Sequence, residues 1–162
     1  MNIKITTWLR EDIKMAADLY LPSLVEELQI KLNTHFENAL KEKGMIKDKN
    51  SKHYIHANEK VKNIYKQMWS ESCHFHDAYN ESSLMWSLGL SWWKDVIPML
   101  NDKHHLTPEK AQELIRLIHT SEIDPEMLNQ KYNYEYFLDK KKKLIKFLDQ
   151  SIEYGESIEC SI

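Results

Sequence analysis

Apolar side chains recur every three to four residues along most of this sequence, which is the spacing of one face of an α-helix. The clearest stripe consists of Leu21, Val25, Leu28, Leu32, Phe36 and Leu40. Only three glycines and four prolines interrupt the 162 residues, and so few helix-breaking residues favour long helices over a many-turned β fold. The sequence therefore predicts an all-α fold, a bundle of about six or seven helices of which two or three are long.

Capping residues and prolines mark the expected ends of these helices. The expected helices cover residues 6–20, 22–43, 53–79, 84–90, 91–97, 108–118 and 133–154, with a further start signal at residues 124–126. Residues 1–5 are expected to form an extended arm, and residues 156–162 a frayed tail. With no linker or internal repeat in the sequence, we predict a single helical domain that spans residues 1–162.

The charge of the chain provides no broad attraction for nucleic acid. Its 25 Asp and Glu residues outnumber its 22 Lys and Arg residues, so the net charge is −3. The one basic run covers residues 140–143, and we interpret it as the solvated face of a helix. In a nucleic-acid-binding alternative, Lys140, Lys142 and Lys143 would contact phosphates. We expect no nucleic-acid partner, because acidic residues flank the run and the total charge is negative.

The cysteine content and the hydropathy of the sequence indicate the cellular compartment of the protein. Cys73 and Cys160 are two lone cysteines that form no disulfide framework, as is typical of a reducing compartment. Residues 1–5 lack the apolar run of a signal peptide, and no stretch approaches the ~20 apolar residues that cross a bilayer. We therefore expect a cytoplasmic protein with no membrane partner.

The densest group of candidate metal ligands lies in residues 71–77. On a helix, Cys73, His76 and Asp77 would share one face, and His74 would lie on another side of the same helix. Thiolate, imidazole and carboxylate groups are the donors that zinc prefers. His104 and His105, which precede an expected helix, are further candidate ligands. The alternative interpretation of this group is structural, with Cys73 packed at the edge of the core and the histidines half-buried.

The doublet His76-Asp77 resembles the metal-binding doublet of the HD-domain phosphohydrolases, an all-helical family. The resemblance implies a metal site completed by an earlier histidine and a distant aspartate, for which His35 and either Asp139 or Asp149 have the right order. The sequence departs from the family pattern because no small aliphatic run precedes the doublet and no glycine follows it.

Tryptophan is concentrated in the most apolar segment of the chain, residues 84–100. Trp86, Trp92 and Trp93 belong to this segment. Adjacent residues on a helix differ by about 100° in direction, so Trp92 and Trp93 cannot both face one narrow core stripe. Either the segment is central core, or part of it binds a partner, because tryptophan dominates binding hot spots.

The sequence lacks the common catalytic motifs. It has no Gly-x-Ser-x-Gly elbow, and its three glycines form neither a phosphate-binding loop nor a dinucleotide fingerprint. We therefore predict a non-catalytic module that binds another protein or itself as a homo-oligomer, with no cofactor, through Trp86, Trp92 and Trp93. The alternative is a metal-dependent hydrolase or metal-binding regulator that holds an ion such as zinc through Cys73, His74, His76 and Asp77, with His104 and His105.

Overall fold

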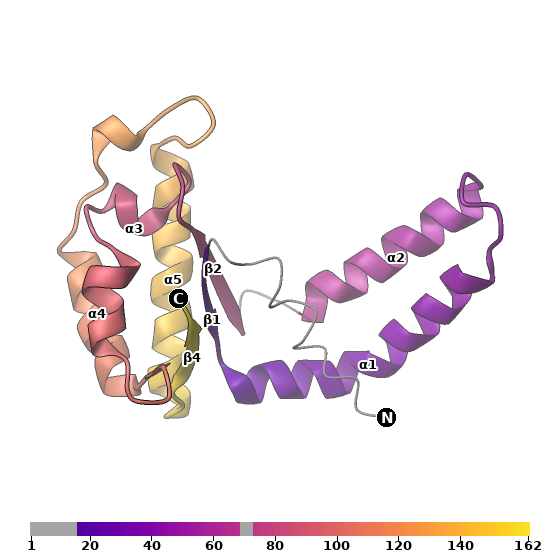
Figure 1. The fold of residues 1–162 in the computed structure, drawn as a ribbon, viewed down its shortest axis with the longest axis horizontal. Helices are drawn as coiled ribbons and strands as arrows, with labels where there is room; N and C mark the ends of the chain where they lie inside the picture. Colours follow the sequence, from indigo (N-terminus) through magenta and orange to yellow (C-terminus); the bar gives the residue numbers. More distant parts are fainter. Residues whose placement is uncertain (1–15, 69–72) are drawn as a thin grey trace. The chain divides into compact units, whose positions relative to one another are not determined.

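The computed structural model describes residues 16–68 and 73–162 (Figure 1). The main elements in chain order are β1 (Ala16–Tyr20), α1 (Pro22–Met45), α2 (Lys52–Met68), β2 (His74–Ala78), α3 (Leu84–Ser87), β3 (His105–Leu106), α4 (Pro108–His119), α5 (Tyr134–Tyr154) and β4 (Ile158–Ser161). Shorter helical turns cover Trp92–Val96, Ile97–Met99 and Pro125–Met127. Two of the three long helices, α1 and α2, are consecutive in the chain.

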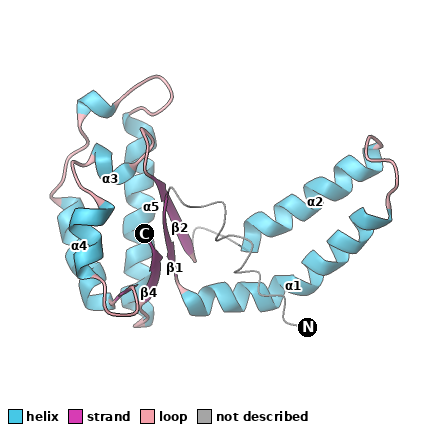
Figure 2. Cartoon of the chain, in the orientation of Figure 1, coloured by secondary structure: helices cyan, strands magenta, loops and turns pink. Residues whose placement is uncertain are grey.

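The predicted all-α class is wrong, because four short strands form a sheet in the order β2-β1-β4-β3 (Figure 2). Strands β3 and β4 are antiparallel, with His105 opposite Glu159 and Leu106 opposite Ile158. Helices still supply most of the described residues. The fold is therefore mixed α/β and dominated by helices.

Strands β1 and β2 lie in segments whose apolar spacing predicts helices. In β2, burial alternates with a period of two, as a strand requires: Phe75 and Asp77 are buried and His76 is exposed. Such alternation over five residues is too short to stand out from the helical pattern around it. Residues 74–78 thus leave the helix predicted for 53–79, and residues 16–20 leave the helix predicted for 6–20. The rest of that first helix and the arm at residues 1–5 lie outside the described residues.

The end of the chain differs from its prediction in the same way. Residues 158–161, expected to be a frayed tail, form β4, in which Ile158 and Cys160 are buried. This strand pairs with β3 and is held within the sheet. Ile158 and Cys160 face the core, and their burial explains why this segment forms a strand. At four residues, the segment is too short to be predicted as a strand from the sequence.

Helix ends follow the sequence signals closely. Pro22 opens α1, Thr107 caps α4 by accepting from the Lys110 N–H, and Asn133 caps α5 by accepting from the Tyr136 N–H. Gly155 ends α5 with a φ of 62°, a left-handed conformation that favours glycine. These ends confirm the helices predicted for residues 108–118 and 133–154 and the predicted helix start at Pro22. The end of α1 is two residues later than predicted, at Met45 rather than at Lys43.

The described chain divides into two compact units. The sheet unit contains residues 16–19 and 75–162, and the hairpin unit contains residues 20–74 without the undescribed 69–72. The division passes through β1 and β2, each of which is one continuous strand.

In the sheet unit, helices α4 and α5 lie side by side (Figure 1). Their facing residues are fully buried, among them Leu114, Ile118 and Leu148. Phe147 of α5 packs on Phe75 of β2, with ring centroids 6.5 Å apart, so α5 also covers the sheet. This unit holds the largest buried side chains and is the core that positions β2.

In the hairpin unit, α1 and α2 pack on each other through contacts such as Phe36 against Tyr65, at 6.2 Å between ring centroids. Ala39, Ala57 and Val61 are the buried residues of these two helices in the part the structure describes. No helix within the described residues is both long enough and apolar enough to cross a membrane.

Candidate functional site

Strand β2 directs its side chains alternately to two faces of the sheet. His74 and His76 share one face, while Phe75 and Asp77 share the buried one. His76 and Asp77, which a helix would have placed together, therefore point in opposite directions. The likeness of this doublet to the HD-domain doublet does not hold, because a metal cannot take both side chains of adjacent strand residues that point to opposite faces.

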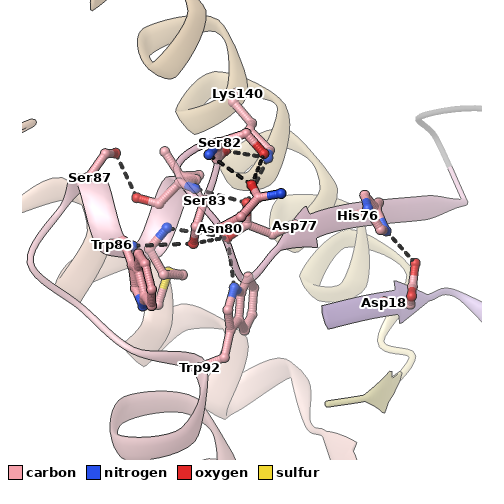
Figure 3. Close-up of polar contacts among 12 residues, drawn as sticks. Asp18, His76, Asp77, Asn80, Ser82, Ser83, Trp86, Ser87, Trp92 and Lys140 are labelled. Carbon is pink, nitrogen blue, oxygen red and sulfur yellow. Dashed lines mark hydrogen bonds and ion pairs between the residues drawn. The ribbon is translucent and has the colours of Figure 1, made fainter. Parts of the chain in front are cut away.

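The carboxylate of Asp77 is fully buried and accepts from five donors (Figure 3). The donors are Ser83 Oγ at 3.2 Å, Leu84 N at 2.8 Å, Met85 N at 3.3 Å, Trp92 Nε1 at 2.7 Å and Lys140 Nζ at 2.6 Å. Two oxygens offer about four lone-pair positions, so this carboxylate is saturated. We call Asp77 with these five partners the Asp77 hub.

The Asp77 hub joins segments that are far apart in the sequence. Its donors come from the start of α3, from the helical turn Trp92–Val96 and from α5. Lys140 supplies a charge opposite the carboxylate, and its side chain is only 14% exposed. A buried carboxylate is tolerated when it is paired and fully hydrogen-bonded. The hub therefore fixes the two apolar segments that carry the predicted interface tryptophans.

The three tryptophans predicted to form an interface have different environments. Trp92 is 2% exposed and donates its indole N–H to Asp77, so it belongs to the core. Trp86 is 52% exposed and Trp93 is 59% exposed. Trp93 packs one side of its ring against Tyr79, with centroids 6.0 Å apart. Two large aromatic side chains thus remain open to solvent beside the hub.

A second polar group occupies the other face of β2. His76 Nδ1 lies 2.9 Å from Asp18 Oδ1 of strand β1 (Figure 3). The Asp18 side chain is 2% exposed, whereas that of His76 is 48% exposed. His74, two residues before His76, stacks on the Tyr20 ring with centroids 4.9 Å apart and planes at 18°. Ligand atoms of Asp18, His74 and His76 all lie within 4.8 Å of one another.

The structure brings together two of the six predicted metal ligands and adds one that the sequence did not indicate. His74 and His76 are joined by Asp18, which lay in a segment predicted to be helical. The overlooked signal is an aspartate in the middle of an apolar strand, Ala16–Tyr20, because a buried carboxylate needs a polar partner. Among residues 16–68 and 73–162, no other three His, Cys, Asp or Glu residues converge in this way.

The remaining predicted ligands lie elsewhere. Asp77 belongs to the hub, and Cys73 is fully buried just before β2. His104 occupies a turn with a φ of 59°, and His105 pairs with Glu159 in the sheet. None of these residues belongs to the Asp18, His74 and His76 group.

Burial shifts the acidity of two groups in the sheet unit. It raises the pKa of Tyr79 to about 12, and the negative charges of Asp18 and Asp77 add to the shift. Burial also raises the pKa of the Cys160 thiol to about 12, and Glu159 contributes in the same direction. Thiolate is the reactive form of cysteine, so Cys160 is unsuited to nucleophilic catalysis at neutral pH.

Two of the four lysines in the basic run of α5 bind buried or partly buried groups of the protein. Lys140 binds Asp77, and Lys141 donates to the Ser121 carbonyl at 2.9 Å. Lys143 pairs with Asp139 at 3.0 Å on the same helix. The run is therefore not a row of four equivalent solvent-facing ammonium groups.

Comparison of the chain with protein-family models, with curated proteins and with solved structures finds no match in any of the three. The function is therefore inferred from the geometry of the described residues.

Proposed function

We propose that this protein is a non-catalytic, cytoplasmic module that binds protein, and that its first occupant is a second copy of the same chain. The observation that carries the proposal is the exposure of Trp86 and Trp93 on two segments that meet at the buried Asp77 hub. Tryptophan is strongly enriched among the residues that contribute most to binding protein partners.

The hub makes these tryptophans suitable anchors. Asp77 accepts from the backbone N–H groups of Leu84 and Met85, directly before Trp86. It also accepts from the indole of Trp92, the neighbour of Trp93. Both segments are thus ordered before a partner arrives, which lowers the conformational entropy lost on binding. Rigid segments with exposed aromatic rings are favourable starting points for a specific interface.

A second copy of the chain could cover Trp86 and Trp93 without any other protein. In a two-fold symmetric dimer, the same patch of each copy meets itself. Trp86 and Trp93 of one copy would then pack near the same residues of the other, and hot spots tend to pair with hot spots.

Size-exclusion chromatography with light scattering tests the proposal over a concentration series. We expect the wild-type chain to dimerise at micromolar concentration and the W86A/W93A double variant to remain monomeric. The matched control is the Y134A/Y154A double variant, which removes two aromatic side chains that are 50% and 56% exposed elsewhere. The control should dimerise like the wild type.

Two outcomes contradict the proposal. One is a wild-type chain that stays monomeric throughout the series. The other is a dimer that the W86A/W93A variant leaves intact. Because both tryptophan side chains are more than half exposed, the double variant should keep its circular-dichroism spectrum, which separates loss of binding from loss of fold.

A further inference from the structure

We infer that Asp18, His74 and His76 form a binding site for one divalent transition-metal ion of the zinc type. The three residues lie on the neighbouring strands β1 and β2, and their ligand atoms lie within 4.8 Å of one another. The site is separate from the proposed protein-binding surface, because the side chains of His76 and Asp77 point to opposite faces of β2.

The spacing is close to that of a loaded site. In tetrahedral zinc coordination, bonds of about 2.0–2.1 Å place neighbouring ligand atoms ~3.3 Å apart. His76 Nδ1 and Asp18 Oδ1 are 2.9 Å apart, so they need to separate by only a few tenths of an ångström. The widest separation in the group, up to 4.8 Å, must contract by roughly 1.5 Å. Because His76 and Asp18 are already 2.9 Å apart, the widest separation involves His74, and small rotations of the imidazole side chains supply an adjustment of this size.

The backbone and a ring contact hold the donors in place. His74 and His76 are two positions apart on one strand, so they project from the same side. The His74 ring stacks on Tyr20 at 4.9 Å, which restricts its orientation. Asp18 is fixed within β1 with its carboxylate almost fully buried. Donors that are ordered before the ion arrives lose little entropy on binding it.

The donor set selects the class of ion. Two imidazoles and one carboxylate suit zinc, cobalt, nickel and ferrous iron, whereas magnesium and calcium prefer oxygen ligands alone. Three protein ligands leave a coordination position for water. The 48% exposure of the His76 side chain leaves a route from solvent to that position.

Isothermal titration of tag-free, full-length protein with Zn²⁺ tests the inference. We expect one saturable site per chain and no saturable binding of Mg²⁺ under the same conditions. The H74Q, H76Q and D18N variants should each bind Zn²⁺ at least tenfold more weakly. The matched controls are H56Q on α2 and H119Q on α4, which should bind like the wild type.

Zinc-edge X-ray absorption on the unaltered, zinc-loaded chain supplies an independent measurement if a variant fails to fold. We expect imidazole nitrogen and oxygen neighbours at about 2.0–2.1 Å and no sulfur neighbour at about 2.3 Å. The inference is overturned if zinc does not bind saturably, if the H74Q and H76Q variants bind it unchanged, if a control variant weakens it equally, or if sulfur coordinates the ion.

Discussion

Two buried aspartates, Asp18 on β1 and Asp77 on β2, show how the same side chain supports two different roles. They are 1% and 0% exposed, and both belong to the same sheet. Asp77 is saturated by two backbone N–H groups, a hydroxyl, an indole and an ammonium. Asp18 pairs with the imidazole of His76 and has a second imidazole, that of His74, within 4.8 Å.

The difference lies in which donors can be exchanged. The partners of Asp77 come from the backbone and from buried side chains, and they cannot leave without exposing unpaired polar groups. His76, by contrast, is half-exposed, and a neutral imidazole nitrogen that solvent can reach is able to exchange a hydrogen bond for a metal bond. Asp77 is therefore expected to determine stability, and Asp18 to determine ligand binding. Variants of the two aspartates and of their partners test this division.

The largest effect is expected from removing the Asp77 carboxylate. The D77A variant leaves the Lys140 ammonium and the donors from α3 and Trp92 without their acceptor. Breaking a buried ion pair by removing one partner costs about 3–5 kcal/mol. Urea unfolding should show a fall in the free energy of unfolding of this size. A loss below about 1 kcal/mol would contradict the role assigned to the hub.

Zinc should stabilise the wild-type chain by the next largest amount. A ligand present at one hundred times its dissociation constant, bound only by the folded state, adds about 2.7 kcal/mol to the free energy of unfolding. Thermal unfolding with and without Zn²⁺ measures the gain, and excess chelator should reverse it. An unchanged melting temperature at saturating zinc would exclude a site in the folded chain.

Replacement of Lys140 should cost less than replacement of Asp77. The K140M variant keeps the apolar stem but removes the cation, while the carboxylate retains its four other donors. We expect a loss of about 1–3 kcal/mol in chemical unfolding, the cost of a buried polar group that loses one partner. The matched K142M variant changes an exposed lysine of the same helix and should be within about 0.5 kcal/mol of the wild type.

The smallest effect in this series is expected from Ser83, which links the hub to α3. Its hydroxyl donates to Asp77 and accepts from the Trp86 N–H as the cap of that helix. The S83A variant should lose about 1 kcal/mol in urea unfolding, as is usual for a capping residue. The same variant should bind Zn²⁺ with wild-type affinity, because Ser83 lies on the Asp77 side of β2.

The sequence predicted those features that short-range chemistry determines. Thr107 with Pro108, and Asn133 with Gly155, marked the ends of α4 and α5, because caps and left-handed glycines act within a single turn. Strands β1 and β2 were predicted as helix, because five residues give too few periods to separate the two patterns. Strand pairing also depends on residues far apart in the chain.

The candidate metal site was predicted only in part, because its residues come together through strand pairing. His74 and His76 were named because they are close in sequence, and a spacing of two places them together on a strand. Asp18 was missed because it meets them through pairing between β1 and β2, across 58 residues. Asp77 was included because of helical spacing, and strand alternation removes it from the group.

The comparison of zinc-induced melting shifts in two variants tests the division between the aspartates most directly. D77N should melt below the wild type without zinc and still gain stability when zinc is added. D18N should show no zinc-induced shift. The account would be contradicted if D18N kept the full shift, or if D77N remained folded but lost it.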